Sequence, residues 1–137
     1  MRVVLALFSA IILSYSFASS KRVLSTLPSF TESMYYLGAE DLLVGVSDYC
    51  NYPSEVRKLP RYGTAFEINL EKLIKDKIDT VLLADIKGSR VRDNLNKLGI
   101  KTIVAPYKDL DDAVKMLQVL NSELKLEQTK KIKKLLK

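Results

Sequence analysis

The sequence contains no histidine and only one cysteine, Cys50, among its 137 residues. Without histidine the chain lacks the base of Ser-His-Asp and Cys-His catalysis, and it lacks the commonest zinc ligand. Cys50 has no second cysteine for a disulfide and no imidazole to activate its thiol, so a half-buried structural role is favoured over a nucleophilic one. These absences count against hydrolytic enzymes and histidine-based metal centres.

Motifs typical of nucleotide-binding proteins and α/β enzymes are also missing. The chain has no G-x-G-x-x-G, Walker or G-x-S-x-G motif, and no acidic pair follows its first predicted strand. An enzyme on a receiver-like or hydrolase-like α/β scaffold is therefore disfavoured. The sequence predicts a protein that is not an enzyme, with no catalytic residue, no metal site and no cofactor.

Positive charge is concentrated near the C-terminus. The formal net charge is +6, and five lysines lie close together at positions 130, 131, 133, 134 and 137. Surfaces that bind single-stranded nucleic acid combine basic residues with aromatic ones, and this segment has no aromatic residue and no arginine. A solvated helix face is the favoured interpretation, and no nucleic-acid partner is predicted.

Residues 1–20 have the pattern of a signal peptide. Arg2 precedes an apolar run over residues 3–13, and small residues at 16, 18 and 20 allow cleavage after Ala18 or Ser20. We therefore expect export to the periplasm with removal of residues 1–20. The alternative is a retained membrane anchor, because the apolar run approaches spanning length.

Strand and helix patterns alternate along the rest of the chain. Strands are expected at residues 22–26, 42–46, 79–84 and 101–105, and helices at 29–37, 69–75, 89–98, 109–120 and 127–137. Such alternation predicts an α/β fold, a three-layer Rossmann-like lobe whose short parallel sheet is flanked by helices.

Several residues indicate where these helices begin, end and face the core. Ser29 and Glu32 fit an S-x-x-E capping box, Asn69 fits an N-cap, and Gly38 fits a helix end. Periodicity predicts buried faces on three helices. The residues expected to point inward are Leu70, Leu73 and Ile74, then Val91, Leu95 and Leu98, and finally Ala113, Met116, Leu117 and Leu120.

In a parallel sheet, the loops that follow the strands lie at one edge, where ligands of α/β proteins bind. Here they are residues 27–29, 47–49, 85–87 and 106–107, and two of them carry a tyrosine, Tyr49 and Tyr107. Amphipathic tyrosines suit a ligand with flat or hydrophobic surfaces. Two plainer alternatives remain open: half-buried packing tyrosines, and an ordinary strand-to-helix turn at Pro28 and Ser29.

The order of short motifs resembles one protein family over nearly all of residues 21–137. It is similar to the amino-terminal lobe of the substrate-binding proteins of ABC importers for cobalamin, ferric siderophores and haem. The motifs that carry the resemblance are RVLSTLPSFTE (22–32), LGA (37–39), LVGVSDYCNYP (43–53), KLPRYG (58–63), NLE (69–71), IDTVL (78–82) and LGI (98–100).

The resemblance implies roles for five residues and a domain organisation. Pro28, Ser29, Tyr49 and Phe66 are implied to face the ligand, and Glu71 to dock onto arginines of the inner-membrane ABC permease. A plain helix-dipole role for Glu71 is the alternative. The implied organisation has a signal peptide at residues 1–20, an amino-terminal lobe at 21–126, and the start of an interlobe helix at 127–137, with no second lobe in this sequence.

Two functions are compatible with this resemblance. The first is an exported single lobe that binds a metal chelate or corrinoid for an ABC importer. The alternative is an interaction module or truncated fragment that binds little ligand without a separate second lobe or the permease, and its apolar residues Ile132, Leu135 and Leu136 are expected to be exposed for pairing. Tyr49 or Tyr52 suits haem, a corrin ring or a ferric siderophore equally, and tyrosinate ligation of haem iron remains open.

Overall fold

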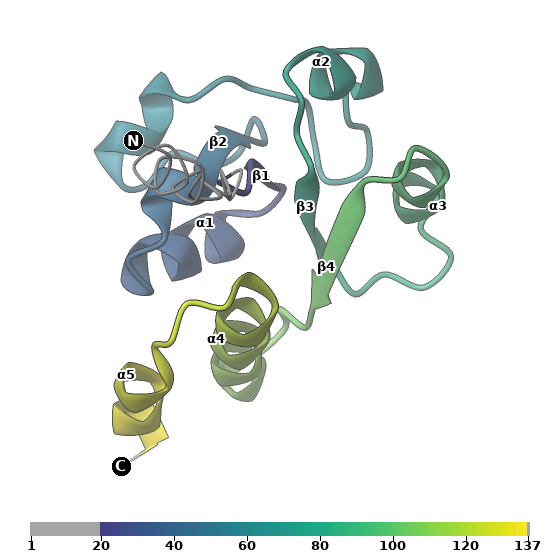
Figure 1. Cartoon of the computed structure of the whole chain (residues 1–137). Helices are drawn as coiled ribbons and strands as arrows, with labels where there is room; N and C mark the ends of the chain where they lie inside the picture. The colour runs from purple at the N-terminus through teal and green to yellow at the C-terminus, as the bar shows by residue number, and fades with distance from the viewer. Residues whose placement is uncertain (1–19, 137) are drawn as a thin grey trace, which may run out of the picture.

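A four-stranded parallel sheet is the centre of the fold (Figure 1). The computed structural model describes residues 20–136. The strands are β1 (Val23–Ser25), β2 (Leu43–Val46), β3 (Thr80–Ala84) and β4 (Lys101–Ala105), in the order β2-β1-β3-β4. Every neighbouring pair is parallel, which confirms the predicted α/β class. The predicted signal peptide, apart from residue 20, lies outside the described residues.

Helices cover both faces of the sheet, as Figure 1 shows. One face carries α1 (Pro28–Tyr36), α4 (Leu110–Leu124) and α5 (Thr129–Lys133), and the other carries α2 (Leu70–Lys75) and α3 (Arg90–Lys97). Short 3-10 helices occur at η1 (Glu40–Leu42), η2 (Ser54–Lys58) and η3 (Lys134–Leu136). No helix within residues 20–136 is both long enough and apolar enough to cross a membrane.

The apolar core is divided by the sheet into two clusters. Successive strand side chains point to opposite faces, so Leu82 packs with α1 and α4 while Val81 and Leu83 pack with α2 and α3. All five residues of β3 are buried, as expected of a central parallel strand. This division explains why the strand is apolar from Val81 to Ala84 rather than alternating.

The first helix begins one residue earlier than the sequence predicted. Its first residue is Pro28, its N-cap is Leu27, and no side chain caps its amino end, so the predicted Ser29–Glu32 capping box is wrong. Proline favours the first helical position because its φ is already helical and that position needs no N–H partner. The predicted end is confirmed: Gly38 has a φ of +68° there.

Burial confirms some predicted inward positions and corrects others. Leu73 and Leu95 are fully buried, but Ile74 is 54% exposed and Leu98 is 46% exposed. Ile74 faces away from the sheet on a helix of only six residues, and Leu98 lies just beyond the end of α3.

The α4 and α5 helices bring two further corrections. Met116, Leu117 and Leu120 are buried as predicted, but Ala113 is exposed. Ile132, expected at the surface, is buried in the cluster with α1 and α4. Leu135 and Leu136 are exposed as expected. The described chain does form a short helix after residue 127, and its role as the start of an interlobe helix stays a prediction.

A segment outside the named strands extends the sheet beside β2. Val46 N–H donates to the Pro60 carbonyl at 3.1 Å, and Tyr62 N–H donates to the Val46 carbonyl at 3.1 Å. The Tyr62 ring packs directly over Gly45, where a Cβ atom would lie 2.2 Å from the ring atom Cε2. The Tyr62 hydroxyl donates to Asp76 at 2.6 Å, just after α2. Tyr62 therefore ties residues 60–63 to both β2 and α2.

The close approach of Gly45 and Tyr62 predicts the effect of one added methyl group. We expect Gly45→Ala to lower the free energy of unfolding by about 1–3 kcal/mol, because the buried ring has to move. Urea unfolding of the variant measures this loss. In a Tyr62→Ala background the same substitution should cost far less, and an equal cost in both backgrounds would show that the ring is not the cause.

The Tyr62 hydroxyl also predicts a dependence of stability on pH. Burial, followed by the hydrogen bond to Asp76, raises the pKa of Tyr62 to about 12. An unfolded tyrosine has a pKa of about 10, so the protonated Tyr62 hydroxyl stabilises the folded state. This contribution to the free energy of unfolding is complete below pH 10 and is lost as the pH rises toward 12. Urea unfolding between pH 8 and pH 11.5 measures the loss. The Tyr62→Phe variant should lose less stability over this range than the wild-type protein, and parallel curves would contradict the assignment.

Candidate functional site

The candidate site is the edge of the sheet where the strands end. Because the strands are parallel, the loops at 26–29, 47–52, 85–89 and 106–109 all leave from this edge. The loop at 64–68 joins them, because residues 61–63 run parallel to β2. The predicted gathering of these loops is confirmed.

Buried hydroxyl groups hold the turn that follows β1. Thr26 Oγ1 donates to the Leu82 carbonyl at 2.7 Å, which joins the end of β1 to β3. Thr31 Oγ1 donates to Ser25 Oγ at 2.8 Å, and Ser25 Oγ donates to the Leu27 carbonyl at 3.1 Å. All three hydroxyl-bearing residues are buried, so their hydrogen bonds are costly to lose. They fix the backbone that carries Pro28, which is partly buried, and Ser29, which is exposed.

The loop after β2 is held by Arg61 and presents aromatic side chains to solvent. Arg61 Nη1 donates to the carbonyls of Ser47 and Cys50, at 2.8 Å and 2.5 Å. Cys50 is fully buried rather than half-buried, and its structural role stays a prediction. Tyr49 is 66% exposed, so the alternative of a half-buried packing tyrosine is wrong at this position.

A side-chain turn positions Phe66 on the neighbouring loop. Thr64 Oγ1 accepts hydrogen bonds from the N–H groups of Phe66 at 3.3 Å and Glu67 at 3.1 Å. Phe66 itself is 74% exposed. It lines a groove of roughly 170 Å³ that it shares with Arg90 of α3. Arg90 is not among the residues predicted from the sequence, although its place soon after the β3 loop is a signal for this edge.

Exposed apolar residues are concentrated at this edge of the sheet. Nine large apolar side chains are exposed among the described residues, and five of them lie on its loops or at the start of α4. These five are Tyr49, Tyr52, Phe66, Tyr107 and Leu110. A gathering of this kind marks a surface suited to binding rather than scattered exposure.

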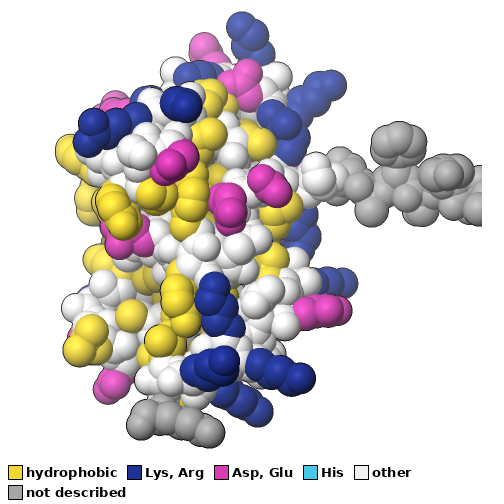
Figure 2. All heavy atoms as spheres, turned by 90° about the vertical axis from the view of Figure 1, so that its left-hand side faces the viewer, with side chains coloured by type: hydrophobic (Ala, Val, Ile, Leu, Met, Phe, Trp, Pro, Cys, Tyr) yellow, Lys and Arg dark blue, Asp and Glu magenta, His cyan; other side chains and the backbone are white. Residues whose placement is uncertain are grey.

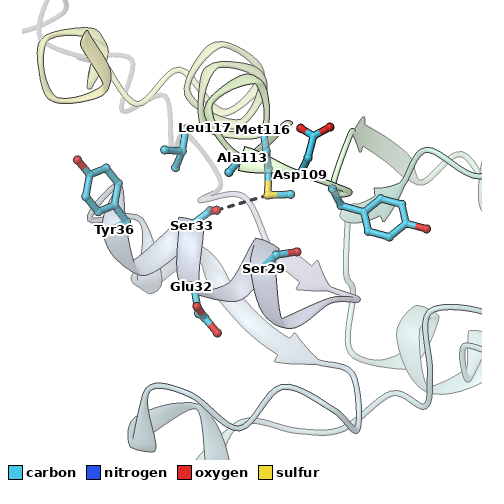
Figure 3. A pocket seen from close by; sticks show the side chains of 9 residues that line it. Ser29, Glu32, Ser33, Tyr36, Asp109, Ala113, Met116 and Leu117 are labelled. Atoms are coloured by element: carbon cyan, nitrogen blue, oxygen red, sulfur yellow. Dashed lines mark hydrogen bonds between the residues drawn. The ribbon is translucent and has the colours of Figure 1, made fainter. Parts of the chain in front are cut away.

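A mainly apolar groove lies between α1 and α4 near the site (Figure 3). Its volume is roughly 270 Å³, and Ser29 and Tyr36 line it from the α1 side. Met116 lies between the two helices, and Ser33 Oγ approaches its sulfur at 3.4 Å. Ser29 is the one predicted ligand-facing residue in this groove.

Neither of these two grooves contains all four predicted ligand-facing residues. Ser29 lines the α1–α4 groove, Phe66 lines the groove beside α3, and Pro28 and Tyr49 line neither. The four lie along one edge of the sheet on three separate loops. The site is therefore an open face.

Glu71 occupies the first turn of α2, where its charge complements the helix dipole. It is exposed and has no side-chain hydrogen bond or ion pair within residues 20–136. Asn69 caps the helix as predicted, by accepting from the Lys72 N–H at 2.9 Å. The carboxylate of Glu71 is thus available to an outside partner.

Within residues 20–136, no group of three or more carboxylate, cysteine or histidine side chains is placed to hold a metal ion. The aromatic groups and the few charged side chains along the edge are the chemical features available for recognition. Such an edge suits contact with the face of a flat molecule.

Comparisons with known proteins give relatives of one kind. No family model matches the chain. It is 36% identical to the vitamin B12-binding protein of Vibrio vulnificus over 110 aligned residues. The aligned region is 79% of this chain and 39% of that protein. It is 38% identical to an uncharacterised ABC transporter substrate-binding lipoprotein of Bacillus subtilis over 78 aligned residues. That aligned region is 57% of this chain and 24% of the lipoprotein.

A solved structure shows the same fold. The periplasmic haem-binding protein of Vibrio cholerae matches 85% of this chain and 45% of its own length, with a TM-score of 0.72 and 24% identity. The chain thus spans less than half the length of each of these three proteins. By sequence and by fold, the chain is a homologue of vitamin B12-binding and ABC transporter substrate-binding proteins, present here as an α/β lobe that covers less than half of their length.

Proposed function

We propose that this lobe forms one wall of the ligand site of an ABC importer for cobalamin, ferric siderophore or haem-type ligands. The observation that carries the proposal is the exposed aromatic edge on a chain related to vitamin B12-binding proteins. Pro28, Ser29, Tyr49 and Phe66 are the proposed ligand contacts. The lobe binds rather than transforms its ligand, so it is not an enzyme.

The positions of these residues support a ligand that lies flat against the edge. Tyr49 and Phe66 are mostly exposed to solvent. Arg61 donates hydrogen bonds to main-chain carbonyls of the loop that carries Tyr49, and Thr64 accepts them from main-chain N–H groups of the loop that carries Phe66. Rigid loops that carry exposed rings lose little conformational freedom when a ligand binds. The buried hydroxyl groups of Thr26 and Thr31 likewise hold the turn at Pro28 and Ser29 in one conformation.

An open face also limits what one lobe achieves alone. Sites for small molecules commonly bury most of the ligand surface, and a single wall leaves one side of a flat ligand in water. This supports the second candidate function, an interaction module that needs a separate second lobe or the permease. The exposed Leu135 and Leu136 at the far end of the chain favour such a partner.

We propose that the protein acts in the periplasm after removal of residues 1–20. The structure neighbour from Vibrio cholerae is periplasmic and the Bacillus subtilis relative is a lipoprotein, so both operate outside the cytoplasm. Within residues 20–136, the buried apolar residues lie between positions 23 and 132.

Titration of residues 21–137 with haem, cyanocobalamin and a ferric siderophore tests the ligand-binding function. We expect saturable binding to at least one of them, by calorimetry or by ligand absorbance. Tyr49→Ala and Phe66→Ala should each weaken that binding by about three- to tenfold, the value of an aromatic contact. Ile74→Ala is the matched control, since Ile74 is an exposed apolar residue on a different element, the helix α2.

If none of the three ligands shows saturable binding, the proposal that the lobe alone binds ligand is wrong. The interaction-module function would then remain, and addition of a second lobe or of the permease would be required for binding. Equal losses for Ile74→Ala and Tyr49→Ala would show that the edge is not the binding surface.

The proposed docking role of Glu71 has its own test. An exposed carboxylate forms a charge-assisted hydrogen bond with an arginine of a partner, so Glu71→Gln should weaken capture of the lobe by the solubilised ABC permease several-fold. Glu40→Gln is the control, because Glu40 is also an exposed acid in the first turn of a helix, η1. Unchanged capture of Glu71→Gln would leave Glu71 with the helix-dipole role only.

A further inference from the structure

The groove beside Phe66 places a positively charged side chain, that of Arg90, at the proposed ligand face. Phe66, Leu70 and Val91 give it apolar walls, and Arg90 supplies a guanidinium group. Phe66 comes from the loop that follows residues 61–63, and Arg90 is the first residue of α3, soon after the β3 loop. Two segments that are 24 positions apart in the sequence thus place an exposed ring and a guanidinium group in one small groove.

Arg90 differs from the arginines that have structural roles in this chain. Arg22, Arg57 and Arg61 each donate to a main-chain carbonyl. The Arg90 side chain is exposed and donates no hydrogen bond to any group within residues 20–136. Its five N–H donors are available to a ligand. Lys87, three positions earlier on the loop after β3, is likewise exposed and has no ion pair among the described residues.

One acid lies in the same groove, and it does not neutralise Arg90. Glu67 also lines the groove, but no ion pair joins it to Arg90 in the described structure. Both side chains are exposed. An exposed pair of this kind would be weak even if it formed, so the carboxylate of a ligand can compete with Glu67 for the guanidinium group.

We propose that Arg90, with Lys87 on the loop that precedes α3, forms an anion subsite at the rim of the proposed ligand face, and that the ligand is a flat molecule with a carboxylate at its edge. This inference rests on the proposed ligand-binding function and specifies its ligand class. The guanidinium fork matches a carboxylate with two parallel hydrogen bonds, while the Phe66 ring contacts the adjoining flat surface. An acidic tetrapyrrole has both features in one molecule.

Binding of three probes to residues 21–137 tests this inference. The probes are haem, which carries two carboxylates, haem dimethyl ester, which has the same ring without the acids, and cyanocobalamin. We expect haem to bind about tenfold more tightly than its diester, both measured in the same detergent solution. Arg90→Gln should weaken haem binding about tenfold and leave diester binding unchanged, and Arg90→Lys should restore part of the loss because it keeps the charge.

A control on the same helix separates a local contact from net charge. Lys97 is exposed near the other end of α3, and Lys97→Gln removes one positive charge as Arg90→Gln does. Lys97→Gln should leave the affinity for haem unchanged. Raising the salt concentration should weaken haem binding more than diester binding, since only the acid probe forms ionic contacts.

The outcomes distinguish failure of this inference from failure of the proposed function. If the diester binds as tightly as haem, if Arg90→Gln has no effect on haem, or if cyanocobalamin binds and haem does not, the anion subsite is wrong while the ligand-binding function stands. If none of the probes binds and a ferric siderophore does not bind either, the ligand-binding function of the lobe fails, and the subsite fails with it.

Discussion

The parallel pairing of β1 with β3 is the constraint on which the rest of this structure depends. Val23, Leu24 and Ser25 pair with Thr80, Val81 and Leu82 across more than fifty positions of sequence. Parallel strands require crossovers over the faces of the sheet, so the helices have to lie on both sides and every strand has to end at the same edge. The buried Thr26 hydroxyl completes this pairing where β1 ends, on the Leu82 carbonyl. The proposed ligand face is therefore a consequence of the strand direction, and the same hydroxyl group that joins β1 to β3 anchors the first loop of that face.

The sequence predicts the parts of the fold that depend on local chemistry. The apolar strand at β3, the Asn69 cap and the glycine at the end of α1 each follow from properties of one residue or one short run. The exposure of Ile74 and the burial of Ile132 do not follow in that way. Ile74 lies four positions after Leu70, a helical spacing, yet faces water, and Ile132 lies in a lysine-rich segment yet packs into the core. Which face of a short helix is buried depends on what lies opposite it, and that is set by tertiary packing rather than by periodicity.

The candidate site shows the same limit. The four loops of the edge and the place of Tyr49 follow from the parallel direction of the predicted strands, because any residue just after a parallel strand lies at that edge. The place of Arg90 in the same groove as Phe66 does not follow from the sequence, since it depends on how α3 packs beside the loop at 64–68. Gly45 is similar: within a predicted strand it is an ordinary small residue, and only the packed Tyr62 ring shows why a larger side chain does not fit there. Contacts between segments that are distant in sequence are the part that a single sequence does not provide.

Tyr62 links the stability of the lobe to the placement of the proposed ligand contacts. Its ring fills the space left by Gly45, its hydroxyl group binds Asp76, and Lys72 lies 4.6 Å from the ring centroid. Arg61 comes immediately before it and holds the loop that carries Tyr49, while Thr64 two positions later holds the loop that carries Phe66. Loosening Tyr62 would thus move both aromatic residues together, because the two loops share one short segment beside β2. This arrangement matters most if the proposed ligand face is open, since a face with one wall has no second surface to hold its contact residues in position.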